Sequence, residues 1–238
     1  MTATQMIWQF LLVALGAYAI GNINFALIIS KLKKTDVRTM GSGNPGTMNM
    51  SRNFGIKIGA LTLLLDMLKG FIPVFVAGLI FKGKFCLNTA FEARDLARYV
   101  AAFFVILGHV YPAALGFKGG KGIASNIGVY FAISPLFATI VLLLMILYVW
   151  WTEYGSLGSL LGITALAVGE LFTLHRKYVL SGIVGVRGLL LATDIVVLAV
   201  CLLSWWAHRG NLVRLLKGEE HRTSIRDMLH RRHGKKTK

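Results

Sequence analysis

The chain has 238 residues, of which 55% are apolar and 15% are charged, and its formal net charge at pH 7 is +16. A soluble domain would be less apolar, so this composition excludes one and indicates that most of the chain lies in lipid. In a soluble protein such an excess of Lys and Arg would suggest nucleic acid. Here basic membrane loops and anionic headgroups explain it, so no nucleic-acid partner is expected.

Apolar runs long enough to cross hydrocarbon recur along the chain. They are Ile7 to Ser30, Ile56 to Phe81, Tyr99 to Phe117, Pro135 to Trp151, Ser156 to Leu174 and Tyr178 to Trp206. Lipid cannot satisfy an exposed backbone, and these runs lack the two-residue alternation of barrel strands. The sequence therefore predicts an all-α polytopic membrane protein.

A shorter apolar run, Ile123 to Ser134, stands directly before Pro135. Loops rich in Lys and Arg stay in the cytoplasm. The first six residues are uncharged, the segment after the first run is basic, and Ala207 to Lys238 carries ten Lys or Arg against three acids. An N-terminus outside and a C-terminus inside require an odd number of spans. We therefore predict seven, with a break at Ser134 and Pro135 that leaves the first helix of the pair short or re-entrant.

Four basic residues lie on the predicted outer loop and count against this topology: Lys82, Lys84, Arg94 and Arg98. Ala17-Tyr18-Ala19 resembles a signal-peptidase site, but no basic segment precedes it, so we expect an uncleaved first helix. Cys86 and Cys201 are too few for a disulfide framework. We expect residues 1–221 to form the membrane domain and residues 222–238 a basic, partly disordered cytoplasmic tail. In that tail Ile225, Met228 and Leu229 have the spacing of a helix on anionic lipid.

Three unusual polar segments fall on the cytoplasmic side in this topology. They are GSGNPGTMNMSR (41–52), GHVYPAALGFKGGKGIASN (108–126) and HRGNLVRLLKGEEH (208–221). Their common location is the strongest functional signal in the chain.

The second segment suits phosphate. Gly119 and Gly120 stand between Lys118 and Lys121, so backbone N–H and ammonium groups can converge where no Cβ obstructs approach. A helix then begins near residue 123, and its first turn adds unpaired N–H groups. The spacing is not that of a Walker A loop. The alternative is a basic loop that only sets orientation.

The first segment cannot continue a helix because of its glycines and Pro45. Irregular backbone at the lipid boundary is tolerated where it lines a polar cavity, and Ser42, Asn44, Asn49 and Arg52 can line one. Arg52 offers bidentate recognition of phosphate. The alternative is a polar turn with Arg52 on a lipid headgroup.

In the third segment His208 and Asn211 lie on one face of a helix, and Arg214 continues the row. His208 is a candidate proton relay or hydrogen-bond donor to an anion. It is equally compatible with an interfacial aromatic belt beside tryptophans. Glu219 and Glu220 are expected to cap the helix or pair with arginine.

Ionisable residues within the spans have a partner or a task. Asp66 and Lys69 are three residues apart on one helix and are expected to form a structural pair. Glu170, Arg187 and Asp194 lie away from the three polar segments and are also expected to be structural.

Together, in order and at similar spacing, the three polar segments resemble the signature regions of the bacterial acyl-phosphate:glycerol-3-phosphate acyltransferase family. The resemblance covers about residues 7–221 and leaves the tail unmatched. It implies a seven-span enzyme of the inner membrane, without a cofactor, that transfers a fatty acyl group from acyl phosphate to the sn-1 hydroxyl of glycerol 3-phosphate. The products are lysophosphatidic acid and phosphate.

The resemblance also implies a site on the cytoplasmic face. Catalytic roles fall to Ser42, His208 and Asn211. Substrate and phosphate binding fall to Arg52, Lys121, Lys118, Gly119, Gly120, Asn44 and Asn49.

The chain departs from the family at two positions of the first segment. The family usually has Gly-Ala-Thr-Asn where this chain has Gly46-Thr47-Met48-Asn49, so the hydroxyl is displaced by one position. Gly43 stands where relatives often have lysine.

The residue inventory fits this chemistry. Acyl phosphate is already activated, so the site has to orient a hydroxyl and stabilise charge on two phosphates and an oxyanion. No HxxxxD sequence and no metal-ligand cluster occurs in the chain. The hydroxyl proton goes either to His208 or to the substrate's own phosphate. A transporter of an organic phosphate or other anion is the alternative function, and a non-catalytic scaffold is a third.

Overall fold

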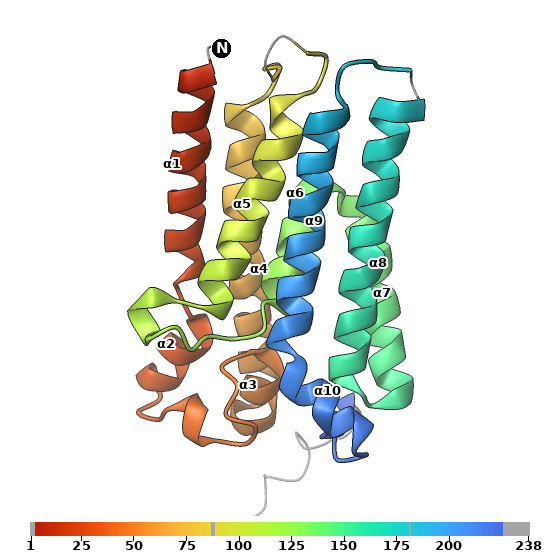
Figure 1. Cartoon of the computed structure of the whole chain (residues 1–238). Coiled ribbons are helices and arrows are strands. Elements are labelled where there is room, and N and C mark those ends of the chain that lie inside the picture. The colour runs from red at the N-terminus through yellow and green to blue at the C-terminus, as the bar shows by residue number, and fades with distance from the viewer. Residues whose placement is uncertain (1–2, 87–88, 181, 226–238) are drawn as a thin grey trace, which may run out of the picture.

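The computed structural model describes residues 3–86, 89–180 and 182–225, and its regular elements are helices. Phe85 and Glu92 add one isolated β-bridge. The elements are α1 (Ala3–Gly21), α2 (Phe25–Leu32), η1 (Val37–Thr39), α3 (Thr47–Phe54), α4 (Ile56–Ile80), α5 (Ala93–Val110), η2 (Ala113–Leu115), α6 (Ile123–Ile133), α7 (Pro135–Thr152), α8 (Gly155–His175), η3 (Arg176–Leu180), α9 (Arg187–Ala207) and α10 (Arg209–Leu216). Figure 1 shows the long helices running roughly side by side, with α2, α3 and α10 gathered at one end of the bundle and the shorter α6 among the long helices.

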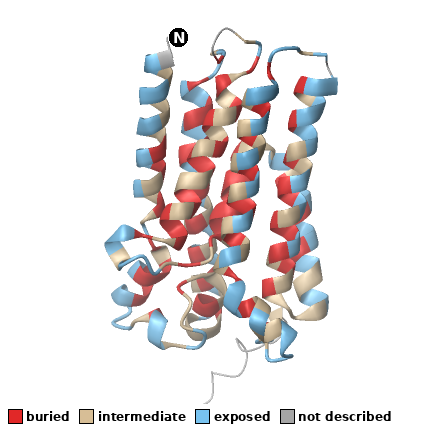
Figure 2. Cartoon of the chain, viewed as in Figure 1, coloured by how far each residue is buried: buried red, intermediate tan, exposed pale blue. Residues whose placement is uncertain are grey.

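The predicted helical membrane bundle is confirmed. Within the described ranges six segments are long and apolar enough to cross a bilayer. They are Thr4–Leu32, Ile56–Ile80, Ala93–Leu115, Pro135–Thr152, Gly155–Leu180 and Arg187–Ala207. Figure 2 shows buried residues on the inner faces of the helices and exposed residues on their outer faces, as expected when lipid surrounds the bundle.

The chain breaks at Ser134, as predicted. Ser134 is both the C-cap of α6 and the N-cap of α7, and Pro135 is the first residue of α7. The 11 residues of α6 rise about 16 Å, roughly half the thickness of the hydrocarbon core. This short helix is the candidate seventh span.

The first apolar run is interrupted, which the sequence did not predict. α1 ends at Gly21 and α2 begins at Phe25. The Asn24 side chain accepts a hydrogen bond from the Leu27 backbone at 3.0 Å, and Asn22 donates to the Tyr18 carbonyl at 2.7 Å. Asparagine side chains compete for backbone partners in this way, and the helix therefore stops inside an apolar run.

The last apolar run also differs from the expectation, because α9 begins at Arg187 rather than at Tyr178. Residues 176–180 extend α8 as a π-helical turn. Gly182 and Gly185 then adopt positive φ, which ends that helix. Arg187 is consequently the exposed first residue of α9 rather than an ionisable residue inside a span.

α4 packs on α1, α3, α5 and α6. Its crossing with α6 is close because two positions lack a side chain. A Cβ at Gly70 would overlap the Ser125 carbonyl, and one at Gly128 would overlap the Met67 carbonyl. Small residues at such crossings let helix backbones meet in a bilayer.

Of the four basic residues expected on the outer loop, Arg94 forms an ion pair in the described part of the chain. Arg94 and Arg98 lie in the first turns of α5 rather than in a loop. Arg94 pairs with Glu92 at 3.2 Å, and Lys177 lies 3.0 Å from Glu92 and 2.8 Å from Asp95. Glu92 and Asp95 thus offset only part of the positive charge that counted against the predicted topology.

Glu170 and Asp194 have the structural partners expected of them. The Tyr99 hydroxyl donates to Glu170 at 2.8 Å, and His175 Nε2 lies 2.8 Å from Asp194. Asp66 and Lys69 form the predicted pair at 3.0 Å.

Candidate functional site

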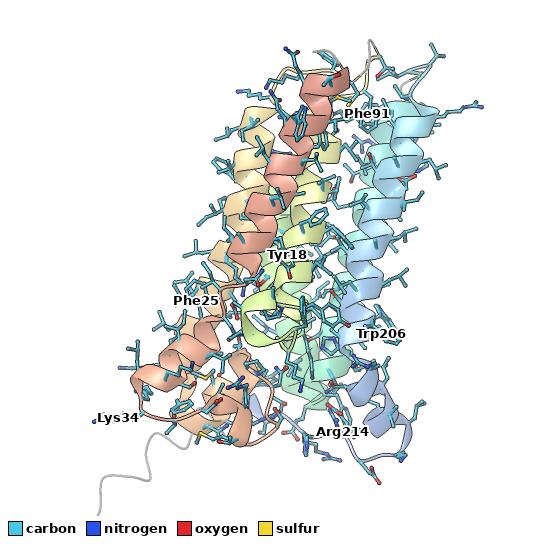
Figure 3. All side chains as sticks on the ribbon, turned by 60° about the vertical axis from the view of Figure 1, so that its left-hand side comes forward. Tyr18, Phe25, Lys34, Phe91, Trp206 and Arg214 are labelled. Atoms are coloured by element: carbon cyan, nitrogen blue, oxygen red, sulfur yellow. The ribbon has the colours of Figure 1, made fainter. Side chains whose placement is uncertain are left out.

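A cavity of about 640 Å³ lies among the helix ends that carry the three polar segments. Figure 1 places α2, α3 and α10 together at this end, opposite the N-terminus. In Figure 3, Arg214 and Lys34 lie at this end and Phe91 at the other. The cavity is therefore at one end of the bundle.

Four helices begin at this cavity. Its lining includes the N-cap and first residue of α3 (Gly46, Thr47), of α6 (Gly122, Ile123) and of α10 (His208, Arg209), together with the first residues of α8 (Gly155, Ser156). Each helix N-terminus presents unpaired backbone N–H groups and the positive end of the helix dipole. Four such ends around one space make it a strong candidate for binding anions.

Arg52 contributes a guanidinium to the cavity from the last turn of α3. Its Nη2 donates to the hydroxyl of Thr223, far along the chain. Burial lowers the pKa of Arg52, and the Glu220 carboxylate opposes that shift. The group remains charged at neutral pH because its ordinary pKa exceeds 12.

Lys121 also lines the cavity, at the end of the glycine-rich loop. Its Nζ donates to Asn211 Oδ1. Burial lowers the pKa of Lys121 to about 8, with Glu220 opposing and the nearby Arg214 and Arg52 adding to the shift. The second and third polar segments are thus joined by a direct contact at the cavity.

His208 is buried between α9 and α10 and lines the cavity. Its Nδ1 lies 2.8 Å from the Ser204 carbonyl. A carbonyl only accepts, so Nδ1 carries the proton and Nε2 is the ring nitrogen left for a ligand. Burial lowers the pKa of His208 to about 4, partly opposed by the Ser204 bond. His208 is therefore neutral at pH 7.

Glu220 holds the third segment in place. Its Oε1 accepts from Asn211 at 2.6 Å and from Ser156 at 3.0 Å, and its Oε2 accepts from Arg214 at 3.0 Å. Partial burial raises the pKa of Glu220, but these hydrogen bonds and the Arg214 charge outweigh it and hold the pKa below its ordinary value. The expected pairing with arginine is present, and it belongs to a larger network.

Asn49 organises the first segment. Its Nδ2 donates to the carbonyls of Val37 at 3.2 Å and Met40 at 2.9 Å. Its Oδ1 accepts from the Ser42 backbone at 3.1 Å and from Asn53 at 3.0 Å. All four of these bonds are internal, so Asn49 supports the loop that carries Ser42.

Eight of the ten predicted site residues line the cavity: Ser42, Asn44, Asn49, Arg52, Gly119, Lys121, His208 and Asn211. Lys118 is exposed and Gly120 is buried, and neither is among the lining residues. The backbone N–H groups of Gly119 and Gly120, predicted to face phosphate, instead donate to the Val110 and His109 carbonyls. Thr47 and Met48 both line it, and the Thr47 hydroxyl is buried with no hydrogen-bond partner in the described part of the chain.

Some lining residues were not predicted from the sequence. They are Asp66, His109, Ser156, Ser159 and Thr223. The sequence marked Asp66 only as the partner of Lys69, and a serine at the start of an apolar run carries no functional signal by itself. Thr223 lies in the predicted tail yet is buried. Of the positions that predicted a helix in the tail, Met228 and Leu229 lie outside the described residues.

A family model described as glycerol-3-phosphate acyltransferase matches residues 11–218. The chain belongs to the glycerol-3-phosphate acyltransferase family. It is an integral-membrane acyltransferase, and it is similar to other glycerol-3-phosphate acyltransferases over nearly its whole length. A glycerol-3-phosphate acyltransferase of Clostridioides difficile is 34% identical over 215 residues, covering 90% of this chain and 95% of the relative. One from Aquifex aeolicus is 38% identical over 206 residues, covering 87% and 95%.

Two solved structures share the fold of this acyltransferase. The crystal structure of PlsY (YgiH), an integral membrane glycerol 3-phosphate acyltransferase, in its glycerol 3-phosphate form has a TM-score of 0.74 and 32% identity. The alignment covers 93% of this chain and 98% of that one. The lysophosphatidic acid form of the same protein gives a TM-score of 0.73 at 32% identity.

The pKa of Lys121 predicts a pH limit for this acyltransferase. Above about pH 8 the ammonium loses its proton, so kcat/KM for glycerol 3-phosphate is expected to fall, approaching tenfold per pH unit. Below that pH the lysine remains charged. The measurement is initial rates from pH 6 to 9.5, corrected for hydrolysis of the acyl donor without protein. In Lys121→Arg the residual activity should not decline above pH 8, whereas a wild-type profile that stays flat to pH 9.5 contradicts the prediction.

Proposed function

We propose that this protein transfers a fatty acyl group from acyl phosphate to the sn-1 hydroxyl of glycerol 3-phosphate. The products are lysophosphatidic acid and inorganic phosphate. The observation that carries the proposal is the convergence of four helix N-termini with Arg52 and Lys121 on one cavity. Both reactants present a phosphate, and such a cavity favours phosphate through helix dipoles and charge-assisted hydrogen bonds.

An apolar wall beside this polar region supports a lipid-like substrate. Its residues come from α4 and α7: Leu63, Leu142, Met145, Ile146 and Val149. The four α7 residues lie on one helix face and extend about 10 Å along the axis. Ile146 is 48% exposed on the bundle surface, so the wall reaches the lipid side. The acyl chain is proposed to enter sideways from the bilayer along this wall.

In the proposed reaction the sn-1 hydroxyl oxygen attacks the acyl carbonyl carbon and forms the ester bond. The bond from that carbon to the phosphate oxygen then breaks, and phosphate leaves with the electron pair. Arg52 and Lys121 hold the phosphates, and the Asn211 amide and Ser42 orient the reacting groups.

The hydroxyl proton is proposed to pass to the substrate's own phosphate group. With its pKa near 4 in the free protein, His208 is a weaker base than a phosphate monoester, whose second pKa is about 6. His208 Nε2 is then left to accept a hydrogen bond from a substrate hydroxyl that is not giving up its proton, and it orients the substrate in that way. This difference in basicity supports phosphate rather than His208 as the proposed proton acceptor.

We further propose seven crossings of the bacterial inner membrane, with the N-terminus outside and the cavity at the cytoplasmic face. Cys86 and Cys201 are both buried, so single cysteines can be introduced with little background labelling. An impermeant thiol reagent applied to intact spheroplasts should label Lys82→Cys and leave Lys34→Cys and Lys118→Cys unlabelled until the cells are opened. Lys34 lies on the stretch that leads into the first segment, and Lys118 lies in the second. Labelling of Lys34→Cys and Lys118→Cys from opposite sides would therefore refute the shared location of the two segments.

The function is tested with purified protein in detergent. Given acyl phosphate and glycerol 3-phosphate, it should release equal amounts of lysophosphatidic acid and inorganic phosphate. Acyl-CoA in place of acyl phosphate should give no product. Product from acyl-CoA alone would overturn the proposed donor. Absence of product from both donors, together with uptake of glycerol 3-phosphate into proteoliposomes, would establish the anion transporter instead.

A further inference from the structure

Buried ionisable side chains lie behind the glycine-rich loop, and the proposed reaction does not use them. Asp66 and Lys69 come from α4 and His109 from the last turn of α5. Their exposed fractions are 2%, 3% and 4%. Ionisable groups are costly within a bilayer and persist where they have a partner or a task. Asp66 and His109 also line the cavity, which suggests a task related to the site.

These side chains form a continuous series of contacts. Lys69 Nζ lies 3.0 Å from Asp66 Oδ1 and donates to the Ile23 carbonyl at 2.6 Å, at the break between α1 and α2. Asp66 Oδ1 lies 3.9 Å from His109 Nδ1. The Ser125 hydroxyl lies 3.3 Å from the same ring nitrogen. Only Ser125 is within hydrogen-bond distance of His109 Nδ1, and the Asp66 carboxylate lies just beyond it, so the Ser125 hydroxyl fixes this edge of the ring.

The other edge of the His109 ring faces the loop. A Cβ at Gly120 would overlap His109 Nε2. Gly120 has no positive φ that would require glycine, so the ring is the reason that position 120 lacks a side chain. The Gly120 N–H donates to the His109 carbonyl at 3.1 Å, and the Gly119 N–H donates to the Val110 carbonyl at 3.1 Å. The loop therefore rests on the end of α5.

We propose that His109 is a positioning residue, whose ring, held by the Ser125 hydroxyl, supports the Gly119–Gly120 turn and sets where Lys121 points. The inference rests on the proposed function, because it takes Lys121 as part of the phosphate site. It assigns to His109 a role through Lys121 rather than through contact with substrate.

The test is a double-mutant cycle between positions 109 and 120. In wild type, Gly120→Ala should raise KM for glycerol 3-phosphate about tenfold. The added methyl cannot displace the packed ring, so the loop has to shift and Lys121 shifts with it. kcat should change less than threefold, since the groups around the reacting carbonyl are untouched. In a His109→Ala background the methyl occupies vacated space, and the further change in KM should be less than about twofold.

A second background keeps the test informative if His109→Ala folds poorly. His109→Asn retains a polar group toward Asp66 and Ser125 but removes the Nε2 edge, so it should relieve Gly120→Ala in the same way. Gly188→Ala is the matched control, because a Cβ at that helical position meets no neighbour within 4 Å. It should leave KM unchanged in every background.

Two outcomes separate this inference from the function on which it rests. If Lys121→Ala binds glycerol 3-phosphate as well as wild type, measured as the ligand-induced rise in melting temperature, the proposed phosphate site is wrong. If Lys121→Ala loses that binding but Gly120→Ala raises KM by the same factor in all three backgrounds, the positioning role of His109 is overturned and the function stands.

Discussion

Replacing Arg52 by alanine is expected to lower kcat/KM for glycerol 3-phosphate by about 100-fold or more. The guanidinium lines the cavity from α3 and is oriented by its bond to Thr223. A hydrogen bond to a charged group contributes about 1.5–3 kcal/mol, and a bidentate contact to phosphate contributes two such bonds. About 3 kcal/mol corresponds to roughly a 100-fold change.

Arg52→Lys should recover at most about a tenth of the lost activity. Lysine restores the charge but not the planar pair of donors, and its ammonium does not occupy the same position against Thr223. The measurement is steady-state kinetics of purified variants, with the folded fraction checked by size-exclusion chromatography.

Arg38→Ala is the matched control. Arg38 lies at the same end of the bundle, pairs with Asp36 at 2.6 Å and is 44% exposed. An exposed pair of this kind contributes little, so its loss should leave kcat/KM within about twofold of wild type. Full activity of Arg52→Ala would remove Arg52 from the site while leaving the proposed reaction intact.

Replacing Glu220 by alanine is expected to impair both activity and stability. The change leaves Asn211, Ser156 and Arg214 without their shared acceptor. The network is only partly buried, so leaving these groups without their acceptor is expected to cost about 1–3 kcal/mol. We expect the melting temperature to fall by about 5 °C or more, and kcat/KM to fall at least about 100-fold because Asn211 and its partner Lys121 lose their orientation.

Glu220→Gln separates shape from charge. Its amide oxygen can still accept from Asn211 and Ser156, but its amide nitrogen would face the Arg214 donor. An intermediate loss is expected.

Glu219→Ala is the control for position 220, because Glu219 is exposed beside it. It should match wild type in melting temperature and rate. Equal effects at positions 219 and 220 would show that the network does not organise the site.

The expected pH dependence of stability follows from the same carboxylate. The pKa of Glu220 is lowered in the folded state, so its contribution is present above its unfolded pKa of about 4.3 and is lost as pH falls through the folded value. The network is therefore intact throughout the neutral range in which the enzyme would be assayed.

The sequence by itself determined the membrane bundle and most of the candidate site. Long apolar runs must form helices in lipid because their backbone has no other hydrogen-bond partner there. Pro135 cannot continue the helix before it, so the short α6 was predictable as well. Arg52, Lys121, His208 and Asn211 were predicted from three polar segments on one side of the membrane and from the resemblance of those segments to the family's signature regions, and all four line the cavity.

The tertiary structure alone decided how these residues work together. Arg52 meets Thr223 across 171 positions of sequence, and Lys121 meets Asn211 across 90. Apolar periodicity specifies which face of a helix is buried but not which distant element it meets. The packing of the bundle therefore decides that four helices begin around one space, that Glu220 gathers the third segment and that His109 lies beneath Gly120.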